Sequence, residues 1–187
     1  ELTKIGNRAR NASWATFGIM GLVSMGWVAR VPEIKDIVNL NNGQFGLVLV
    51  SGTIGSLFGA QLAGRLIHTF GSRRVTSVAI FVMPLGLIGI GLAQTTPFLV
   101  FSLFVMGFGY SSMDISVNTQ AAVIEKIVKR RWMSTFHALW SVGAFSAALL
   151  GGAIAHFISP KTHLVALGII CMLAYIPGAI FLLPPDL

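Results

Sequence analysis

Long runs without a charged residue divide this chain, and short basic clusters separate the runs. Charged residues make up 10% of the sequence and apolar residues 55%, and the mean hydropathy is +0.80. A soluble domain carries about 25% charged residues. The chain therefore lacks the polar side chains needed to cover a surface in water, and a lipid bilayer is its expected solvent.

The uncharged runs predict six membrane-spanning helices, because a helix needs roughly 20 mostly apolar residues to cross a bilayer. The run from residue 75 to 113 must cross twice, and Gln94–Pro97 is the expected turn, since proline suits the start of a helix. The strands of a membrane barrel would instead alternate in polarity at every second residue. The sequence therefore predicts an all-α bundle in one domain, with the prolines at 184 and 185 ending the last helix. The expected spans are residues 12–29, 43–67, 75–93, 98–124, 133–157 and 164–183.

Basic residues are divided unevenly between the two sides of such a bundle. Six spans put both termini on one side, and that side holds ten of the thirteen Lys and Arg residues. The other side holds only Arg30, Lys35 and Lys161. Because short loops rich in Lys and Arg stay in the cytoplasm, we predict that both termini are cytoplasmic, in a bacterial inner membrane. Nucleic-acid binding is not expected, since it needs basic residues spread along one face.

Small residues recur at every fourth position in two of the spans. The second span has Gly55, Gly59 and Ala63, and the fifth has Gly143, Ala147 and Gly151. Such stripes let helix backbones approach closely in lipid. The two stripes lie in the middle helix of each group of three, and these two helices run in opposite directions. We therefore expect an inverted three-plus-three repeat.

The connection between the second and third spans, residues 64–75, reads GRLIHTFGSRRV. It resembles the signature loop of the major facilitator superfamily, G-x-L-x-D-x-x-G-x-R-[RK], with His68 where the family has aspartate. The resemblance implies a cytoplasmic latch, in which an arginine pairs with an acid at the end of the fourth span. A plain basic turn that anchors the chain to anionic lipid is the alternative. The latch residues implied are Gly64, His68, Gly71, Arg73 and Arg74, with Glu125 as the acid.

Two further stretches, GWVARVPEIKDI at residues 26–37 and FHALWSVG at residues 136–143, resemble a branch near the fucose-permease-type sugar–proton symporters. The resemblance covers essentially the whole chain and implies the N-terminal six-helix half of a twelve-helix transporter. Both ends of the chain look like cuts. The implied partner is a second six-helix half, from the same polypeptide or from a homodimer mate. The motifs of drug–proton antiporters are incomplete, since Leu103 and Ala148 replace their arginine and proline.

One acidic residue, Asp114, lies inside a span. An Asp at a helix centre costs about 3 kcal/mol on insertion scales, so such an acid is a candidate functional residue. Asn118 and Tyr110 lie one turn on and one turn back, and so share its face. We expect these three residues to bind the substrate or a coupling proton, with Arg30 and His137 as further candidates. The alternatives are a structural hydrogen-bond knot for Asp114, snorkelling for Arg30 and simple packing for His137.

Enzymatic signatures are missing from the sequence: it contains no nucleophile elbow, phosphate loop, dinucleotide fingerprint or metal-ligand cluster. Neither an enzyme nor a cofactor or metal is expected. The sequence predicts a secondary transporter that moves a small polar solute, such as a sugar, with a proton by alternating access. A drug/proton exporter and a non-transporting scaffold or inactive half are the alternatives.

Overall fold

The computed structural model describes residues 1–184, and every regular element among them is a helix. Six of these helices are long and apolar enough to cross a membrane, which confirms the predicted all-α fold. They are α1 (Leu2–Met25), α3 (Asn42–Phe70), α4 (Ser72–Leu92), α5 (Thr96–Val128), α6 (Met133–Ile154) and α7 (Pro160–Ile180). A 3-10 turn, η1 (Val28–Arg30), and a short helix, α2 (Val31–Ile37), connect α1 to α3.

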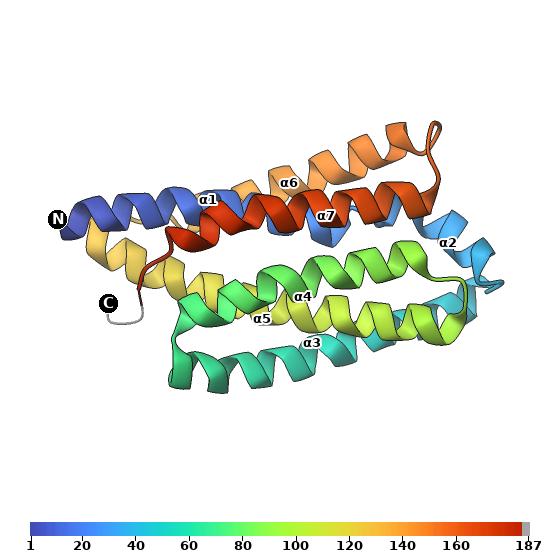
Figure 1. Cartoon of the computed structure of the whole chain (residues 1–187), viewed down its shortest axis with the longest axis horizontal. Helices are drawn as coiled ribbons and strands as arrows, with labels where there is room; N and C mark the ends of the chain where they lie inside the picture. Colours follow the sequence, from blue (N-terminus) through green and yellow to red (C-terminus); the bar gives the residue numbers. More distant parts are fainter. Residues whose placement is uncertain (185–187) are drawn as a thin grey trace.

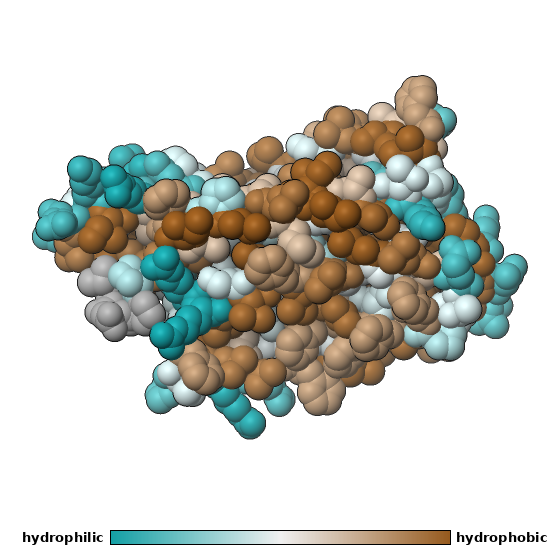
Figure 2. Space-filling model, viewed as in Figure 1, coloured by the Kyte–Doolittle hydropathy of each residue, from teal (hydrophilic) through white to brown (hydrophobic). Residues whose placement is uncertain are grey.

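The long helices run alternately up and down, so both termini lie at the same end of the bundle (Figure 1). We call it the basic end, because it carries ten of the thirteen Lys and Arg residues. These residues are Lys4, Arg8, Arg10, Arg65, Arg73, Arg74, Lys126, Lys129, Arg130 and Arg131. Apolar side chains cover the middle of the molecule and polar ones gather at its two ends (Figure 2). This is the distribution of side chains expected of an integral membrane protein.

Several helices extend beyond the spans predicted from hydropathy. The first helix begins at Leu2 rather than near residue 12, and α5 runs from Thr96 to Val128. Hydropathy marks only the part of a helix that lies in hydrocarbon, whereas the backbone hydrogen bonds continue into the polar region beyond it. The last helix ends at Ile180, before the predicted boundary at residue 183. Pro185, expected to help end it, lies outside the described residues.

Close glycine contacts join two pairs of helices. Helix α3 packs along α5, and α6 packs along α1. A Cβ added to Gly107 of α5 would overlap the carbonyl oxygen of Gly52, and one added to Gly143 of α6 would overlap that of Gly18. The two predicted small-residue stripes are buried, as close packing requires. The second long helix of each group of three thus packs closely on the first long helix of the other group, as expected of an inverted repeat.

Polar side chains tie the helices together at the basic end. The amide of Gln120, on α5, donates to Ser72 Oγ at 2.8 Å and accepts from the backbone N–H of Leu183 at 2.9 Å. One turn nearer the bundle centre, Thr76 Oγ1 donates to Ser116 Oγ at 2.8 Å. These bonds join α4, α5 and the segment after α7. They therefore fix the position of α5, the helix that carries the candidate site.

Candidate functional site

Helix α5 packs against α1, α3 and α4, and it carries the three polar residues predicted to act together. The side-chain Nδ2 of Asn118 donates to Asp114 Oδ1 at 3.0 Å and to the Asp114 carbonyl oxygen at 2.8 Å. Tyr110, one turn towards the opposite end, lies within Coulombic range of Asp114. All three side chains are half-buried. Within residues 1–184 no ion pair involves Asp114, so its carboxyl group is oriented by a neutral donor alone.

Helix α6 adds an imidazole to this group. His137 lies within Coulombic range of Asp114 and is exposed on the surface of the chain. Its ring packs edge-on against Phe17 of α1, with the centroids 5.4 Å apart. Phe17 also stacks on Phe136, the residue before His137, at 5.4 Å. These aromatic contacts hold the imidazole between α1 and α6 and leave it open on one side. The structure therefore places Tyr110, Asp114 and Asn118 along one side of α5, and His137 reaches towards Asp114 from α6.

The first turn of α6 is fixed by a carboxylate from α5. One oxygen of Glu125, Oε1, accepts hydrogen bonds from the backbone N–H groups of Trp132 and Met133, the second at 2.7 Å. The first N–H groups of a helix have no partner within the helix, and a carboxylate there also meets the positive end of the helix dipole. Glu125 therefore positions the helix that carries His137.

The predicted pairing of Glu125 with an arginine of the α3–α4 connection is not formed within residues 1–184. Arg73 Nη2 donates instead to the backbone carbonyl of Ile180 at 2.7 Å. The two groups have other partners instead: Glu125 Oε1 accepts two backbone N–H groups of α6, and the Arg73 guanidinium donates to the segment where α7 ends. Among the other predicted latch residues, Gly64 and His68 are exposed, and Gly71 makes the tight α3–α4 turn with φ 83°.

A hollow of about 420 Å³ lies beside Tyr110, between α1, α3, α5 and α6. Residues with hydroxyl or indole side chains are among those that line it. They are Ser24, Trp27, Thr53, Ser56, Tyr110 and Trp140. Of these only Tyr110 was singled out from the sequence. The sequence feature that could have pointed to the hollow is the pair Thr53 and Ser56, two hydroxyl residues one turn apart in an apolar span. In the structure, Ser56 Oγ donates to the carbonyl of Gly107 at 3.1 Å.

Asp114 and Asn118 border a second, more open space farther along α5. This shallow surface groove runs along α5 alone, with Thr119 and Lys126 among its polar residues. Tyr110 borders the hollow and Asp114 borders the groove, so the two side chains, one turn apart, stand between the two spaces.

Arg30 is not brought to this site. Its side chain is fully buried at the opposite end of the bundle, where its donors are bonded to the chain itself. Nε donates to His163 Nδ1 at 3.0 Å, Nη1 to Glu33 at 2.9 Å and Nη2 to the carbonyl of Ile158 at 2.9 Å. The structure thus supports neither substrate contact nor snorkelling for Arg30. Its donors are satisfied by Glu33, three residues on, and by His163 and Ile158, which sequence spacing did not connect to it.

The family model of the Major Facilitator Superfamily matches residues 12–187 of the chain. The chain is 36% identical over 141 residues to an uncharacterized transporter of Sinorhizobium fredii, covering 75% of the chain and 37% of that protein. It is 35% identical over 153 residues to an uncharacterized MFS-type transporter of Yersinia pestis, covering 80% and 39%.

The membrane protein MosC of Rhizobium meliloti is 28% identical over 151 residues, covering 80% of the chain and 37% of that protein. The chain thus matches less than half the length of each of these relatives, between 37% and 39%. The six spans, the α3–α4 connection and these matches agree: the chain belongs to the major facilitator superfamily, a family of membrane transporters.

Proposed function

We propose that this chain forms the N-terminal half of a secondary transporter that carries a small polar solute together with a proton. The observation that carries the proposal is the Asp114–Asn118 pair on α5, beside a hollow lined by hydroxyl and indole groups. A carboxyl group within a membrane span is costly to insert, and such groups commonly belong to proton relays or substrate sites. Asn118 can donate to the carboxylate, and a protonated Asp114 can itself donate to a solute.

The chemistry of the hollow favours a hydroxylated solute, such as a sugar. Hydroxyl groups such as those of Thr53 and Tyr110 both donate and accept hydrogen bonds, as a sugar hydroxyl does. The indole rings of Trp27 and Trp140 offer flat apolar surfaces beside them. No basic side chain lines the hollow among the residues described, so a neutral solute suits it better than an anionic one. The resemblance to fucose-permease-type symporters supports the same solute class.

A second six-helix half is part of the proposal. Thr53, His137 and Ser141 are exposed on the faces of α3 and α6 beside the site, where a second half would cover them. Transporters of this kind bind their solutes at the midplane between two repeats, and one repeat rocks against the other. The second half comes from the same polypeptide or from a second copy of the chain.

The proposed orientation places the basic end of the bundle in the cytoplasm, at a bacterial inner membrane. It rests on the ten-to-three division of Lys and Arg between the two ends. In this orientation Asp114 lies on the cytoplasmic side of Tyr110 and of the hollow. A proton and a solute that enter from outside would therefore meet the hollow first and the carboxyl group second.

The experiment that tests the function uses the full-length protein in proteoliposomes that contain a pH-sensitive dye. A panel of neutral hexoses and hexitols is added outside, and the internal pH is followed. Proton symport predicts that the interior acidifies when the right solute is added, and that protein-free liposomes show no change. A drug/proton exporter would instead alkalinise the interior when a lipophilic cation enters. A non-transporting scaffold would give no proton flux with any solute, and that result would contradict the proposal.

A further inference from the structure

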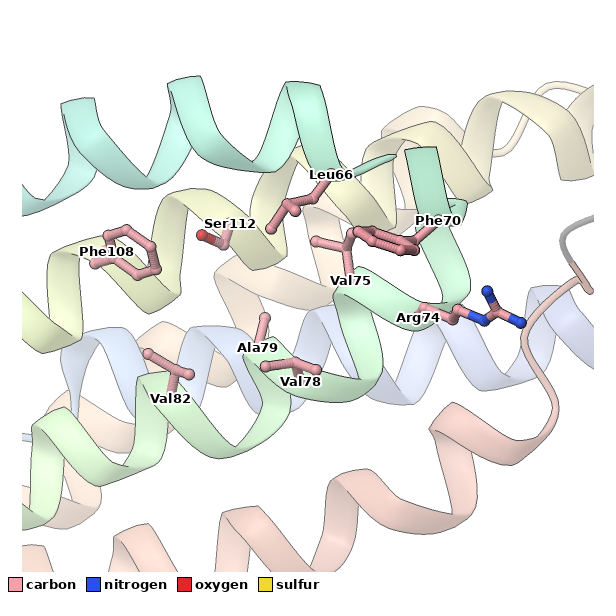
Figure 3. Close-up of a pocket in the computed structure, with 9 residues that line it drawn as sticks. All are labelled: Leu66, Phe70, Arg74, Val75, Val78, Ala79, Val82, Phe108 and Ser112. Atoms are coloured by element: carbon pink, nitrogen blue, oxygen red, sulfur yellow. The ribbon is translucent and has the colours of Figure 1, made fainter. Parts of the chain in front are cut away.

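A separate apolar pocket lies between α3, α4 and α5, near the basic end of the bundle. Its volume is about 300 Å³. Leu66, Val75, Val82 and Phe108 are among its walls, and Figure 3 shows side chains from the three helices around the space between them. Only two of the lining residues are polar, Arg74 and Ser112, and Ser112 Oγ already donates to the carbonyl of Gly59 at 3.3 Å. Apart from Arg74, the walls thus offer little to a polar ligand.

The pocket follows from how the three helices pack. Helices α3 and α4 each lie along α5, but they contact each other only sparingly. Gly71, with its positive φ of 83°, allows the chain to turn sharply between them. A wedge therefore remains between α3 and α4, with α5 as its floor. The side chains at its rim, Phe70 and Val78, are 48% and 63% exposed, as is usual for residues that face lipid.

Arg74 stands at the basic end of this pocket. Its guanidinium points away from the apolar side chains, towards the end of the bundle (Figure 3). Within residues 1–184 it makes no hydrogen bond or ion pair, whereas its neighbour Arg73 is bonded to the carbonyl of Ile180 at 2.7 Å. A positive charge thus stands at the basic end of the bundle, directly beside a space lined almost entirely by apolar side chains.

We propose that this pocket binds one anionic phospholipid, with an acyl chain between α3 and α4 and the headgroup phosphate on Arg74. Arginine binds phosphate through a planar fork of N–H groups. Burying methylenes against apolar walls removes the empty space between helices, which would otherwise forfeit dispersion contacts. The lipid class follows from charge, because basic side chains near a membrane surface attract anionic lipids by about 1 kcal/mol each.

Native mass spectrometry of the full-length protein tests this site, with phosphatidylglycerol and phosphatidylcholine of identical acyl chains as probes. The wild-type protein should retain one phosphatidylglycerol more tightly than any phosphatidylcholine. Arg74→Gln should weaken retention of that lipid about fivefold, the equivalent of about 1 kcal/mol. Arg65→Gln is the matched control, because Arg65 is an exposed basic residue of the same end that does not line the pocket.

A second pair of variants tests the acyl-chain part. Val82→Phe should fill the pocket and abolish retention of the tight lipid, and Val78→Phe at the exposed rim should weaken it without a risk to folding. Excess glycerophosphoglycerol, which has the headgroup but no chains, should not displace the lipid. Equal loss with Arg65→Gln, displacement by the free headgroup, or unchanged retention in both valine variants would each overturn the proposal.

Discussion

The guanidinium Nε of Arg30 donates a hydrogen bond to Nδ1 of His163 at 3.0 Å, across 133 positions of sequence. The bond joins the segment after α1 to the first turn of α7 at the opposite end of the bundle. Both side chains are buried, at 0% and 6% exposure. Because Nδ1 accepts the bond, the ring proton of a neutral His163 lies on Nε2. Arg30 therefore links the segment after α1 to α7 and to the α6–α7 connection, through hydrogen bonds that also include Glu33 and the carbonyl of Ile158.

Replacing Arg30 with Gln should destabilise the protein by about 1–3 kcal/mol, because it leaves the buried His163 Nδ1 and the Ile158 carbonyl without their donor. Arg30→Lys should rescue little of this loss, since a lysine ammonium lacks the planar fork that reaches three acceptors. The midpoint of thermal unfolding in detergent measures both effects. Lys35→Gln, at the same end, removes only an exposed hydrogen bond to Asn42 and should change the midpoint little. Equal midpoints for Arg30→Gln and Lys35→Gln would contradict the assigned role.

The cap on α6 predicts a graded series at Glu125. Glu125→Ala should cost about 1–2 kcal/mol, the usual range for the loss of an N-terminal cap. Glu125→Gln should cost less, because its amide oxygen still accepts the bonds of Trp132 and Met133 without the charge. Lys126→Ala, at the exposed neighbouring position, serves as the control. If alanine and glutamine cost the same at Glu125, the hydrogen bonds to α6 do not stabilise the protein.

Two glycines allow a direct test of close helix packing. Gly107→Ala should destabilise the bundle by about 1–3 kcal/mol, since its Cβ would overlap the carbonyl oxygen of Gly52 and force α3 from α5. Gly152→Ala, within α6, places its Cβ in open space. It should be neutral or slightly stabilising, because alanine favours a helix over glycine. Unfolding midpoints measure the difference, and equal effects of the two substitutions would show that the α3–α5 contact is not close.

The proposed orientation predicts which positions a membrane-impermeant thiol reagent can reach in whole cells. With Cys171 replaced by serine, Lys161→Cys should be labelled from outside and Arg130→Cys should be labelled only after the membrane is opened. Both native residues are exposed, so accessibility depends on the side of the membrane rather than on burial. Labelling of Arg130→Cys in intact cells, with Lys161→Cys protected, would reverse the topology.

The number of helices and the turn at Gln94–Pro97 were predictable from the sequence, because the cost of placing charge in hydrocarbon acts on each segment by itself. The face shared by Tyr110, Asp114 and Asn118 was predictable for a related reason, since a spacing of four fixes neighbours on a helix. The buried glycine stripes followed in the same way. In each case the information lies within one helix.

Partners from different helices were not predictable in this way. Glu125 was expected to meet an arginine of the α3–α4 connection, but it caps α6. Arg30 was expected at the substrate or the membrane surface, but it meets His163 and Ile158. In both cases several partners of similar chemistry compete, and the distances set by packing select among them. The contributions of Thr53 and Ser56 to the hollow depend likewise on how α3 is rotated against α5.

The central claim is that Asp114 carries the coupling proton, and solute accumulation by the full-length Asp114→Asn protein tests it most directly. Asparagine keeps the shape of the side chain but cannot release a proton. Thr119→Val is the matched control, because Thr119 lines the same groove and its hydroxyl is bonded to the carbonyl of Ile115. The account predicts that proton-driven accumulation falls at least about tenfold in Asp114→Asn, at unchanged expression and unfolding midpoint, and stays near wild type in Thr119→Val. Wild-type accumulation by Asp114→Asn would contradict the account and leave Asp114 as a structural hydrogen-bonding residue.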